Sequence, residues 1–449
     1  MRSLFILILI GIGIAGGVVS RHVALLTYVW FSLFRPVEYV WWNLAPLRLS
    51  LVTGLLLLVP SLLTGVFPNM THPLSLLSWV FMGCVLVAQY TTYVPPDWAW
   101  VDQFARLLVV SGLSVSLATT KPRLSQLIAV IAGSFAFYSA KAGVVALLGG
   151  GVQFAEGQAG AFVDNNGYAL AINMAIPFMA TAALTLTVPF PGIKYIRQAF
   201  WICIPLSILT VIGTMSRGGL LGLGTLAVVF VLLQRRPILW GTGIALVGGL
   251  VFAFAPKPEG YMERMGTITT YEEVGEGSAL SRLHFWRVAT VMVADNPLGV
   301  GLRNYDLAYD DYDDLNGEFG RGRSVHSSHF QVLAEAGYLG FVVWVSMFAY
   351  AVITCLRIRF GAAALAGLSD EDRRYYIVSA TSLAASMFAF IVGGAFIAAA
   401  NNDFTWMTFG VTAALQRMYK AEVLALQPAR IEADRAVAVI PAPRRKAIA

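Results

Sequence analysis

Two histidines, His326 and His329, lie three residues apart in a polar segment that directly precedes an apolar run. A neutral imidazole can accept a proton from a hydroxyl group near pH 7, which is the role of a general base. The plainer alternative is a histidine that caps or hydrogen-bonds at the start of a helix. A metal site would need a third ligand, and none is evident near the pair. We place His326 first as a candidate base, and the choice between His326 and His329 stays open.

Arg217 lies between two apolar runs, in Thr-Met-Ser-Arg-Gly-Gly-Leu at 214–220. An arginine at membrane depth is energetically costly, which favours a functional partner for it. Its planar guanidinium suits a phosphate or pyrophosphate group. The alternative is an arginine at a helix end that extends its charged group to the aqueous interface.

A third group of candidates lies in an amphipathic segment that we predict to be a helix from Ser278 to Ala294. On a helix, Arg282 and Trp286 share one face, whereas Arg287 points about 140° away from Arg282. We therefore expect Arg282 to face a ligand. Arg287 is then a structural residue or a contact at the edge of a phosphate, and the alternative for both is a solvated helix face.

Several residues are candidates for supporting roles around this site. Asn166 follows Asp164 directly before an apolar run, where an aspartate most simply caps a helix. The other supporting candidates are His329, Trp286 and Arg303.

The elements that position these residues must be membrane helices. The chain of 449 residues is 57% hydrophobic and only 12% charged, and its mean hydropathy is +0.70. Apolar runs long enough to cross a bilayer predict an all-α bundle of about 12 transmembrane spans, twelve or thirteen by count. The runs cover 4–20, 22–37, 49–67, 74–92, 104–120, 124–149, 167–189, 199–216, 218–234, 238–255, 338–357, 375–400 and 404–417.

The distribution of lysine and arginine predicts the orientation of these spans, because cytoplasmic loops carry an excess of both. Basic residues at 121–123, 194–197, 235–236 and 357–374 and in the C-terminal tail place those segments inside. Alternation then places 93–102, 149–167, 217, 257–337 and 401–403 outside. Residues 257–336 hold 13 of the 25 acidic and 7 of the 31 basic residues, as an outer loop should. Thirteen spans conflict with this orientation at the N-terminus, so we expect one early segment to be short, re-entrant or merged.

The chain then divides into four parts. We expect transmembrane helices over 1–256, a large helical outer loop domain over 257–336, further transmembrane helices over 337–420 and a flexible cytoplasmic tail over 421–449. Within the loop domain, residues 305–318 are predicted to be loop and 324–336 to be helical again.

Asp311 and Asp313 form a D-x-D pair, a pattern that holds a divalent metal on the diphosphate of a nucleotide sugar in many transferases. Nucleotide sugars are cytoplasmic, whereas this loop is predicted to lie outside. A calcium loop is also disfavoured, because Leu315 occupies the next ligand position. We interpret these aspartates as solvated acids and expect neither a metal nor another cofactor.

These motifs, in this order, resemble the O-antigen ligase and polymerase superfamily. The N-terminal third is similar to the O-glycosylation ligases associated with exosortase systems. The similarity spans nearly the whole chain. The residues that carry it are Val-Trp-Phe-Ser-Leu-Phe-Arg-Pro at 29–36, Phe-Val-Asp-Asn-Asn-Gly-Tyr-Ala at 162–169, Ser-Arg-Gly-Gly at 216–219, Arg282-x-x-x-Trp286, Asn-Pro-Leu-Gly-Val-Gly at 296–301 and His326 followed by Leu-Ala-Glu-Ala-Gly-Tyr-Leu-Gly at 333–340.

The resemblance implies a multi-pass protein of the bacterial inner membrane whose active site faces the periplasm. Its donor would be a glycan on undecaprenyl pyrophosphate, and its acceptor the lipid A core oligosaccharide. By position, His326 matches the family histidine that activates the acceptor hydroxyl, and Arg217 and Arg282 match the arginines that hold the donor pyrophosphate. The family usually has Asn where this chain has Ser327, and an aromatic residue is common where it has His329. The expected reaction is metal-independent and inverting, with membrane lipid as its surroundings and no nucleic acid partner.

Three other functions remain open on the sequence. A polymerase of the same superfamily would use a second polyprenyl-linked glycan as its acceptor, and a protein O-oligosaccharyltransferase would use a side-chain hydroxyl. A polysaccharide transporter is less favoured, because the sequence lacks inverted repeats and charged residues at span centres.

Overall fold

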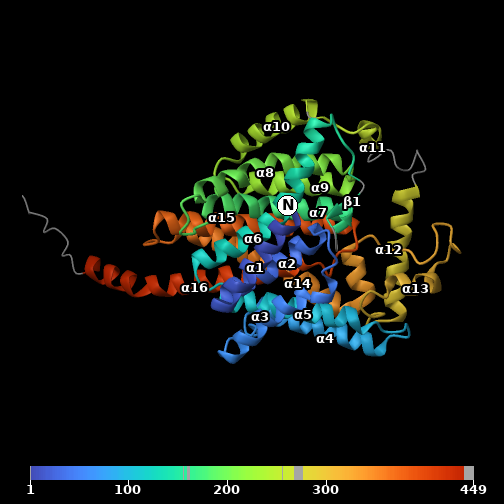
Figure 1. Cartoon of the computed structure of the whole chain (residues 1–449), viewed down its shortest axis with the longest axis horizontal. Coiled ribbons are helices and arrows are strands. Elements are labelled where there is room, and N and C mark those ends of the chain that lie inside the picture. The colour runs from blue at the N-terminus through green and yellow to red at the C-terminus, as the bar shows by residue number, and fades with distance from the viewer. Residues whose placement is uncertain (1, 155, 159–161, 255, 267–276, 439–449) are drawn as a thin grey trace, which may run out of the picture.

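The computed structural model describes residues 2–154, 156–158, 162–254, 256–266 and 277–438, most of them helical. A short antiparallel ribbon pairs strand β1 (Glu156–Gln158) with β2 (Phe162–Asp164). The α-helices, shown in Figure 1, are α1 (Arg2–Val19), α2 (Arg21–Phe34), α3 (Leu49–Leu63), α4 (Pro73–Thr91), α5 (Trp98–Leu117), α6 (Lys121–Leu148), α7 (Asn165–Thr185), α8 (Ile193–Gly213), α9 (Arg217–Leu232), α10 (Pro237–Phe254), α11 (Tyr261–Gly266), α12 (Gly277–Asp295), α13 (Tyr305–Tyr312), α14 (Ser328–Ala364), α15 (Asp370–Gly393) and α16 (Asp403–Ala438). Short 3-10 helices are η1 (Pro36–Tyr39), η2 (Ala45–Leu47) and η3 (Gly394–Phe396).

Each of the thirteen predicted apolar runs coincides with an α-helix, which confirms the all-α class. Within the described residues, six helices are long and apolar enough to cross a membrane: α4, α6, α7, α8, α14 and α15 with η3. Four more, α1, α3, α9 and α10, contain shorter apolar helices. The chain is therefore a membrane protein, and the count of about 12 spans stays a prediction. Helix α2 has only 14 residues, or about 21 Å, which is less than the hydrocarbon layer.

Helix α7 lies at the centre of the bundle and packs against α6, α8, α9 and α15. The approach of α9 is close because a Cβ on Gly219 would come within 2.6 Å of the Ala169 Cβ. The Asn173 amide on α7 donates a hydrogen bond of 2.7 Å to the Gly219 carbonyl. A glycine in this part of the chain therefore allows two apolar helices to pack closely.

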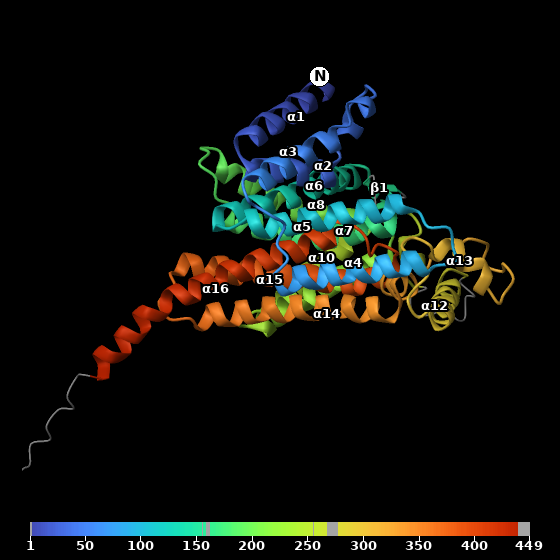
Figure 2. The ribbon, with the colours of Figure 1, turned by 90° about the horizontal axis from the view of Figure 1, so that it is seen from below.

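The predicted outer loop and the C-terminal end of α16 lie at opposite ends of this bundle. Helices α12 and α13 lie at one end of the long axis, and the C-terminal part of α16 extends from the other (Figure 1, Figure 2). Helix α16 continues through Ala438, past residue 421, where the sequence predicted the start of a flexible tail. Residues 439–449 lie outside the described residues.

Two expectations for the loop domain need correction, while the predicted helix over 278–294 is confirmed by α12. Residues predicted to be loop form α13, which buries Tyr305, Ala308 and Tyr309 at helical spacing between exposed acidic residues. The helix predicted over 324–336 begins only at Ser328, because Ser327 is extended and caps it.

A break inside α14 attaches the loop domain to the bundle. Gly337 has φ 70° and ψ −175°, a conformation that strongly favours glycine. The loop containing Pro297 and Val300 pairs with this break, since the Val300 N–H donates to the Ala334 carbonyl and the Tyr338 N–H donates to the Pro297 carbonyl. Two motifs that are separate in the sequence, 296–301 and 333–340, therefore meet in space.

Candidate functional site

His326 lies in the non-helical segment before α14, at the junction of the loop domain and the bundle. Its ring lies 5.9 Å from the Phe285 ring of α12. Burial lowers the pKa of His326 below 6.5, and the guanidinium groups of Arg282 and Arg323 lower it further, whereas the Asp164 carboxylate acts to raise it. The imidazole is therefore neutral at pH 7, the state in which it can accept a proton. The structure brings His326, Arg282 and Asp164 into one electrostatic neighbourhood.

His329 has a different environment, in which both ring nitrogens have protein partners. Its Nε2 lies 2.8 Å from the Ile391 carbonyl oxygen, so this nitrogen must carry a proton and donate it. Its Nδ1 accepts a hydrogen bond of 3.3 Å from the Trp344 indole. These contacts use the one lone pair of the neutral ring and tie together α14 and α15. Between the two histidines, the geometry favours His326 as the base.

The two arginines of α12 lie on different faces, as predicted from their spacing. Arg282 is half-buried and close enough to His326 for its charge to lower the pKa of the imidazole. Arg287 is exposed, and its guanidinium forms a 2.6 Å ion pair with Asp314. Trp286 stacks on Phe330 of α14 at 5.3 Å between ring centroids, with the ring planes only 10° apart. Trp286 therefore holds α12 against α14, and Arg287 is directed away from the histidine.

Arg217 is the first residue of α9, and its position depends on the cap of that helix. The Ser216 hydroxyl accepts a hydrogen bond of 3.0 Å from the Gly219 N–H and donates one of 2.7 Å to the Asn166 side chain. Met215, just before the cap, has a φ of 53°. Asn166 thus supports Arg217 through Ser216, at the N-terminal end of α7.

Asp164 connects the start of α7 to the neighbourhood of His326. Its Oδ1 accepts hydrogen bonds from the backbone N–H groups of Asn166 and Gly167, at 2.9 and 3.1 Å, which fixes the carboxylate as the helix cap. Among the described residues, no donor is bonded to its second oxygen. Asp164 lies near His326 and also faces a cavity.

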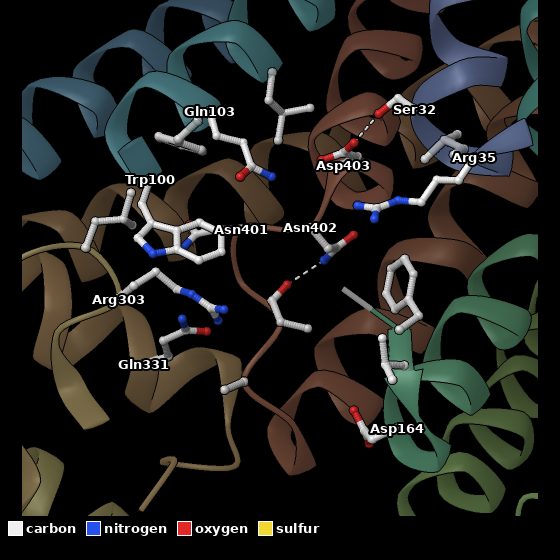
Figure 3. Close-up of a pocket in the computed structure, with 18 of the residues that line it drawn as sticks. Ser32, Arg35, Trp100, Gln103, Asp164, Arg303, Gln331, Asn401, Asn402 and Asp403 are labelled. Atoms are coloured by element: carbon white, nitrogen blue, oxygen red, sulfur yellow. Dashed lines mark hydrogen bonds between the residues drawn. The ribbon is translucent and has the colours of Figure 1, made fainter. Parts of the chain in front are cut away.

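This cavity has a volume of about 700 Å³ and lies where the predicted outer segments converge (Figure 3). Its wall is formed in part by four segments that were predicted to lie outside, namely 93–102, 149–167, 401–403 and the loop domain. These four segments therefore lie at the same end of the bundle. Its polar lining residues are Ser32, Arg35, Gln103, Asp164, Arg303, Gln331, Asn401, Asn402 and Asp403, with Trp100 as the aromatic member.

Three of the candidate residues have a left-handed backbone, and so does the residue before the cap of α9. Arg35 and Arg303, which line the cavity, have φ values of 51° and 62°. His326, at 48°, and Met215 are in the same left-handed region. Left-handed backbone is unfavourable for residues with a Cβ and is found preferentially at functional sites.

The aspartate run does not form the metal pattern of a D-x-D site. Asp311 accepts a hydrogen bond from the Tyr93 hydroxyl, whereas Asp313 bonds to His284 at 2.8 Å. Burial acts to raise the pKa of Asp313, but hydrogen bonds from two backbone N–H groups and from His284 lower it overall. His284, Asp313 and Asp314 offer ligand atoms within 4.8 Å of one another. Because these atoms already pair with protein groups, we interpret the group as a network that ties α12 to the turn after α13.

The sequence did not identify most residues of the cavity wall. Arg35 directly follows α2, while Trp100 and Asp403 lie on α5 and α16. Arg323, which acts on His326, was also missed. The sequence did contain one signal for these residues. Each of Arg35, Trp100 and Asp403 is a polar or aromatic residue at or near the end of an apolar run. Trp100 and Asp403 also fall in segments that were predicted to lie outside.

A family model described as O-antigen ligase matches residues 202–345, about a third of the chain. The matched segment includes Arg217, Arg282 and His326. No curated protein matches this chain. The family match confirms the resemblance to the O-antigen ligase superfamily, while the exosortase-associated subgroup stays a prediction. The family match supports the interpretation of this chain as a membrane glycosyltransferase of the O-antigen ligase or polymerase type.

Proposed function

We propose, with the O-antigen ligase match as the premise, that this protein transfers a glycan from undecaprenyl pyrophosphate to the lipid A core oligosaccharide. The transfer takes place at the periplasmic face of the bacterial inner membrane, within the junction of the loop domain and the bundle. The observation that carries the proposal is the grouping of a neutral histidine, His326, with Arg282 and Asp164 inside that junction.

In this mechanism, the His326 imidazole accepts the proton of the acceptor hydroxyl as its oxygen attacks the anomeric carbon of the first donor sugar. The bond between that carbon and the pyrophosphate oxygen breaks, and undecaprenyl pyrophosphate leaves. A single displacement of this kind inverts the anomeric configuration.

The charge that develops on the leaving pyrophosphate is held by Arg217 and Arg282. Fixed cationic donors directed at a developing charge are among the largest contributions to catalysis. Arginine suits this role because its planar fork can bind phosphate oxygens in pairs. Two such residues neutralise a diphosphate in part without a metal ion.

The Asp164 carboxylate has a place in the same scheme. Once His326 has accepted the proton, the ring is an imidazolium held near two guanidinium groups, which is unfavourable. The nearby carboxylate offsets that repulsion. Because Asp164 is fixed by two backbone N–H groups, it does this without reorganisation.

A deletion of the gene in its host tests the proposal. The strain is complemented with wild type, His326→Ala, Arg282→Ala or Arg287→Ala, and membrane abundance is checked before lipopolysaccharide, polyprenyl-linked glycan and glycoproteins are resolved. We expect bare lipid A core and accumulated polyprenyl-linked glycan in the deletion strain. Wild type and Arg287→Ala restore the ligated product, and the other two variants do not.

Two results would overturn the proposal. Intact lipopolysaccharide in the deletion strain with a loss of chain length or free polysaccharide indicates a polymerase. Loss of glycoprotein alone indicates a protein O-oligosaccharyltransferase. Full rescue by His326→Ala would refute the proposed base.

A further inference from the structure

We propose that the 700 Å³ cavity is the acceptor site, and that it binds one or two uncharged sugar residues of the acceptor glycan. We assign recognition of the sugar to four residues of the wall: Trp100 and Gln103 of α5, Arg303 of the loop domain and Asn401 before α16. This inference rests on the proposed function and adds the location and chemistry of the acceptor.

The side chains of the wall match the chemistry of a sugar ring. Gln103, Gln331, Asn401 and Asn402 are amides, which donate and accept hydrogen bonds at the same time and so can pair with neighbouring hydroxyl groups. Trp100 offers an apolar ring at the cavity edge and is 37% exposed. A cavity of this size lies within the usual range of about 300–1,000 Å³ for small-molecule sites.

The charges of the wall argue against the pyrophosphate as the occupant. Arg35 and Arg303 share the wall with an equal number of acidic side chains, Asp164 and Asp403. Arg35 is also paired with Glu38 at 3.6 Å. Bringing a dianion close to two carboxylates is unfavourable, whereas alternating donors and acceptors suit an uncharged polyol. The pyrophosphate is better placed by Arg217 and Arg282.

The wall is built in advance of binding. The Arg303 guanidinium lies 4.4 Å from the centre of the Trp100 ring, which fixes both side chains by a cation–π contact. The loop before α16 is held by Asn402, which accepts a hydrogen bond of 2.9 Å from the Thr405 N–H and donates to the Ala399 carbonyl. Among the described residues, the buried Asn401 amide nitrogen has no hydrogen-bond partner. Figure 3 shows Trp100, Arg303 and Asn401 on the same side of the cavity.

The cavity also lies next to the proposed base. Asp164 is part of its wall and is close enough to His326 to act on its charge. A sugar held in the cavity would therefore lie against a residue, Asp164, whose charge also acts on the proposed base.

Steady-state kinetics with the full-length protein in detergent test this assignment. The donor is polyprenyl-linked glycan extracted from the deletion strain, and the acceptor probe is lipid A core from the same strain. Trp100→Ala and Gln103→Ala are compared with Trp98→Ala, a matched control on the same helix. Trp98 has a similar exposure, 41%, contacts the Tyr90 ring at a tilt and does not line the cavity. We expect the acceptor KM to rise about tenfold in Trp100→Ala, equivalent to one lost aromatic contact.

The outcomes separate this inference from the proposed function. If wild type transfers the glycan and His326→Ala does not, but Trp100→Ala and Gln103→Ala keep the wild-type acceptor KM, the acceptor site is refuted and the function stands. A rise of the donor KM in place of the acceptor KM also refutes the assignment, because the cavity would then bind the donor. If wild type transfers nothing to lipid A core, the proposed function itself fails.

Discussion

The two histidines provide a sharp prediction, because the structure assigns them opposite roles. His326→Gln removes the proposed base, and a general base contributes about 10²–10⁴-fold to a rate. His329→Phe removes the hydrogen bonds to the Ile391 carbonyl and the Trp344 indole. Each such bond is worth about 0.5–1.5 kcal/mol, so the fold should lose about 1–3 kcal/mol. With an unfolding entropy of about 2.1 cal/mol/K per residue, that loss lowers the melting temperature of a chain of 449 residues by about 1–3 °C.

The assay measures the transfer rate per folded molecule and the melting temperature of each purified variant. We expect His326→Gln to lose transfer and to melt within about 1 °C of wild type. His329→Phe should melt lower and keep transfer within about threefold of wild type, because its ring does not contact the reacting groups in the proposed mechanism. Loss of transfer in a stable His329→Phe, together with an active His326→Gln, would refute the reasoning and make His329 the base.

Three further predictions follow from the same geometry. Arg323→Gln removes a positive charge that lowers the pKa of His326, so that pKa rises. Since the neutral ring is the active form, the acid limb of the kcat/KM profile then moves to higher pH. Arg282→Gln should lower the transfer rate about 10²-fold. Arg287→Gln loses only an exposed ion pair, so its transfer rate should stay within about twofold of wild type. Single-turnover rates measure both effects. Gly337→Ala should reduce the folded yield in size-exclusion chromatography by destabilising the fold by more than about 1 kcal/mol, because its Cβ would come 2.3 Å from a carbonyl oxygen at a positive φ.

Each of these has a contrary result. An acid limb that stays in place or moves to lower pH would separate Arg323 from the base. Equal effects at the two arginines of α12 would contradict the face assignment. A fully folded Gly337→Ala would show that the break in α14 does not need glycine.

The sequence predicted the helices well because apolar runs are a local property of the chain. Every run of sufficient length became a helix, and the amphipathic spacing of residues 278–294 located α12 to within a residue at each end. Helix α13 was missed for a physical reason. Its buried residues, Tyr305, Ala308 and Tyr309, alternate with acidic residues, so its mean apolarity is low and its stability depends on packing against α12.

The site was predicted in part. The spacing of Arg282 and Arg287 correctly separated their faces, and the structure places Arg282 beside His326. The sequence left the choice of histidine open, because the partners of His329 lie on distant parts of the chain: Ile391 is 62 residues away. The cavity wall combines α2, α5 and the loop before α16, so only the folded chain reveals it.

The most direct test of the account is transfer by the full-length protein in proteoliposomes that contain only polyprenyl-pyrophosphate-linked glycan and lipid A core. Nucleotide sugar is omitted and a chelator is present throughout. We expect a ligated product with inverted anomeric configuration, release of polyprenyl pyrophosphate, and loss of both in His326→Ala. Transfer that requires a nucleotide sugar or a metal ion, or movement of the glycan across the vesicle membrane without any new bond, would contradict it.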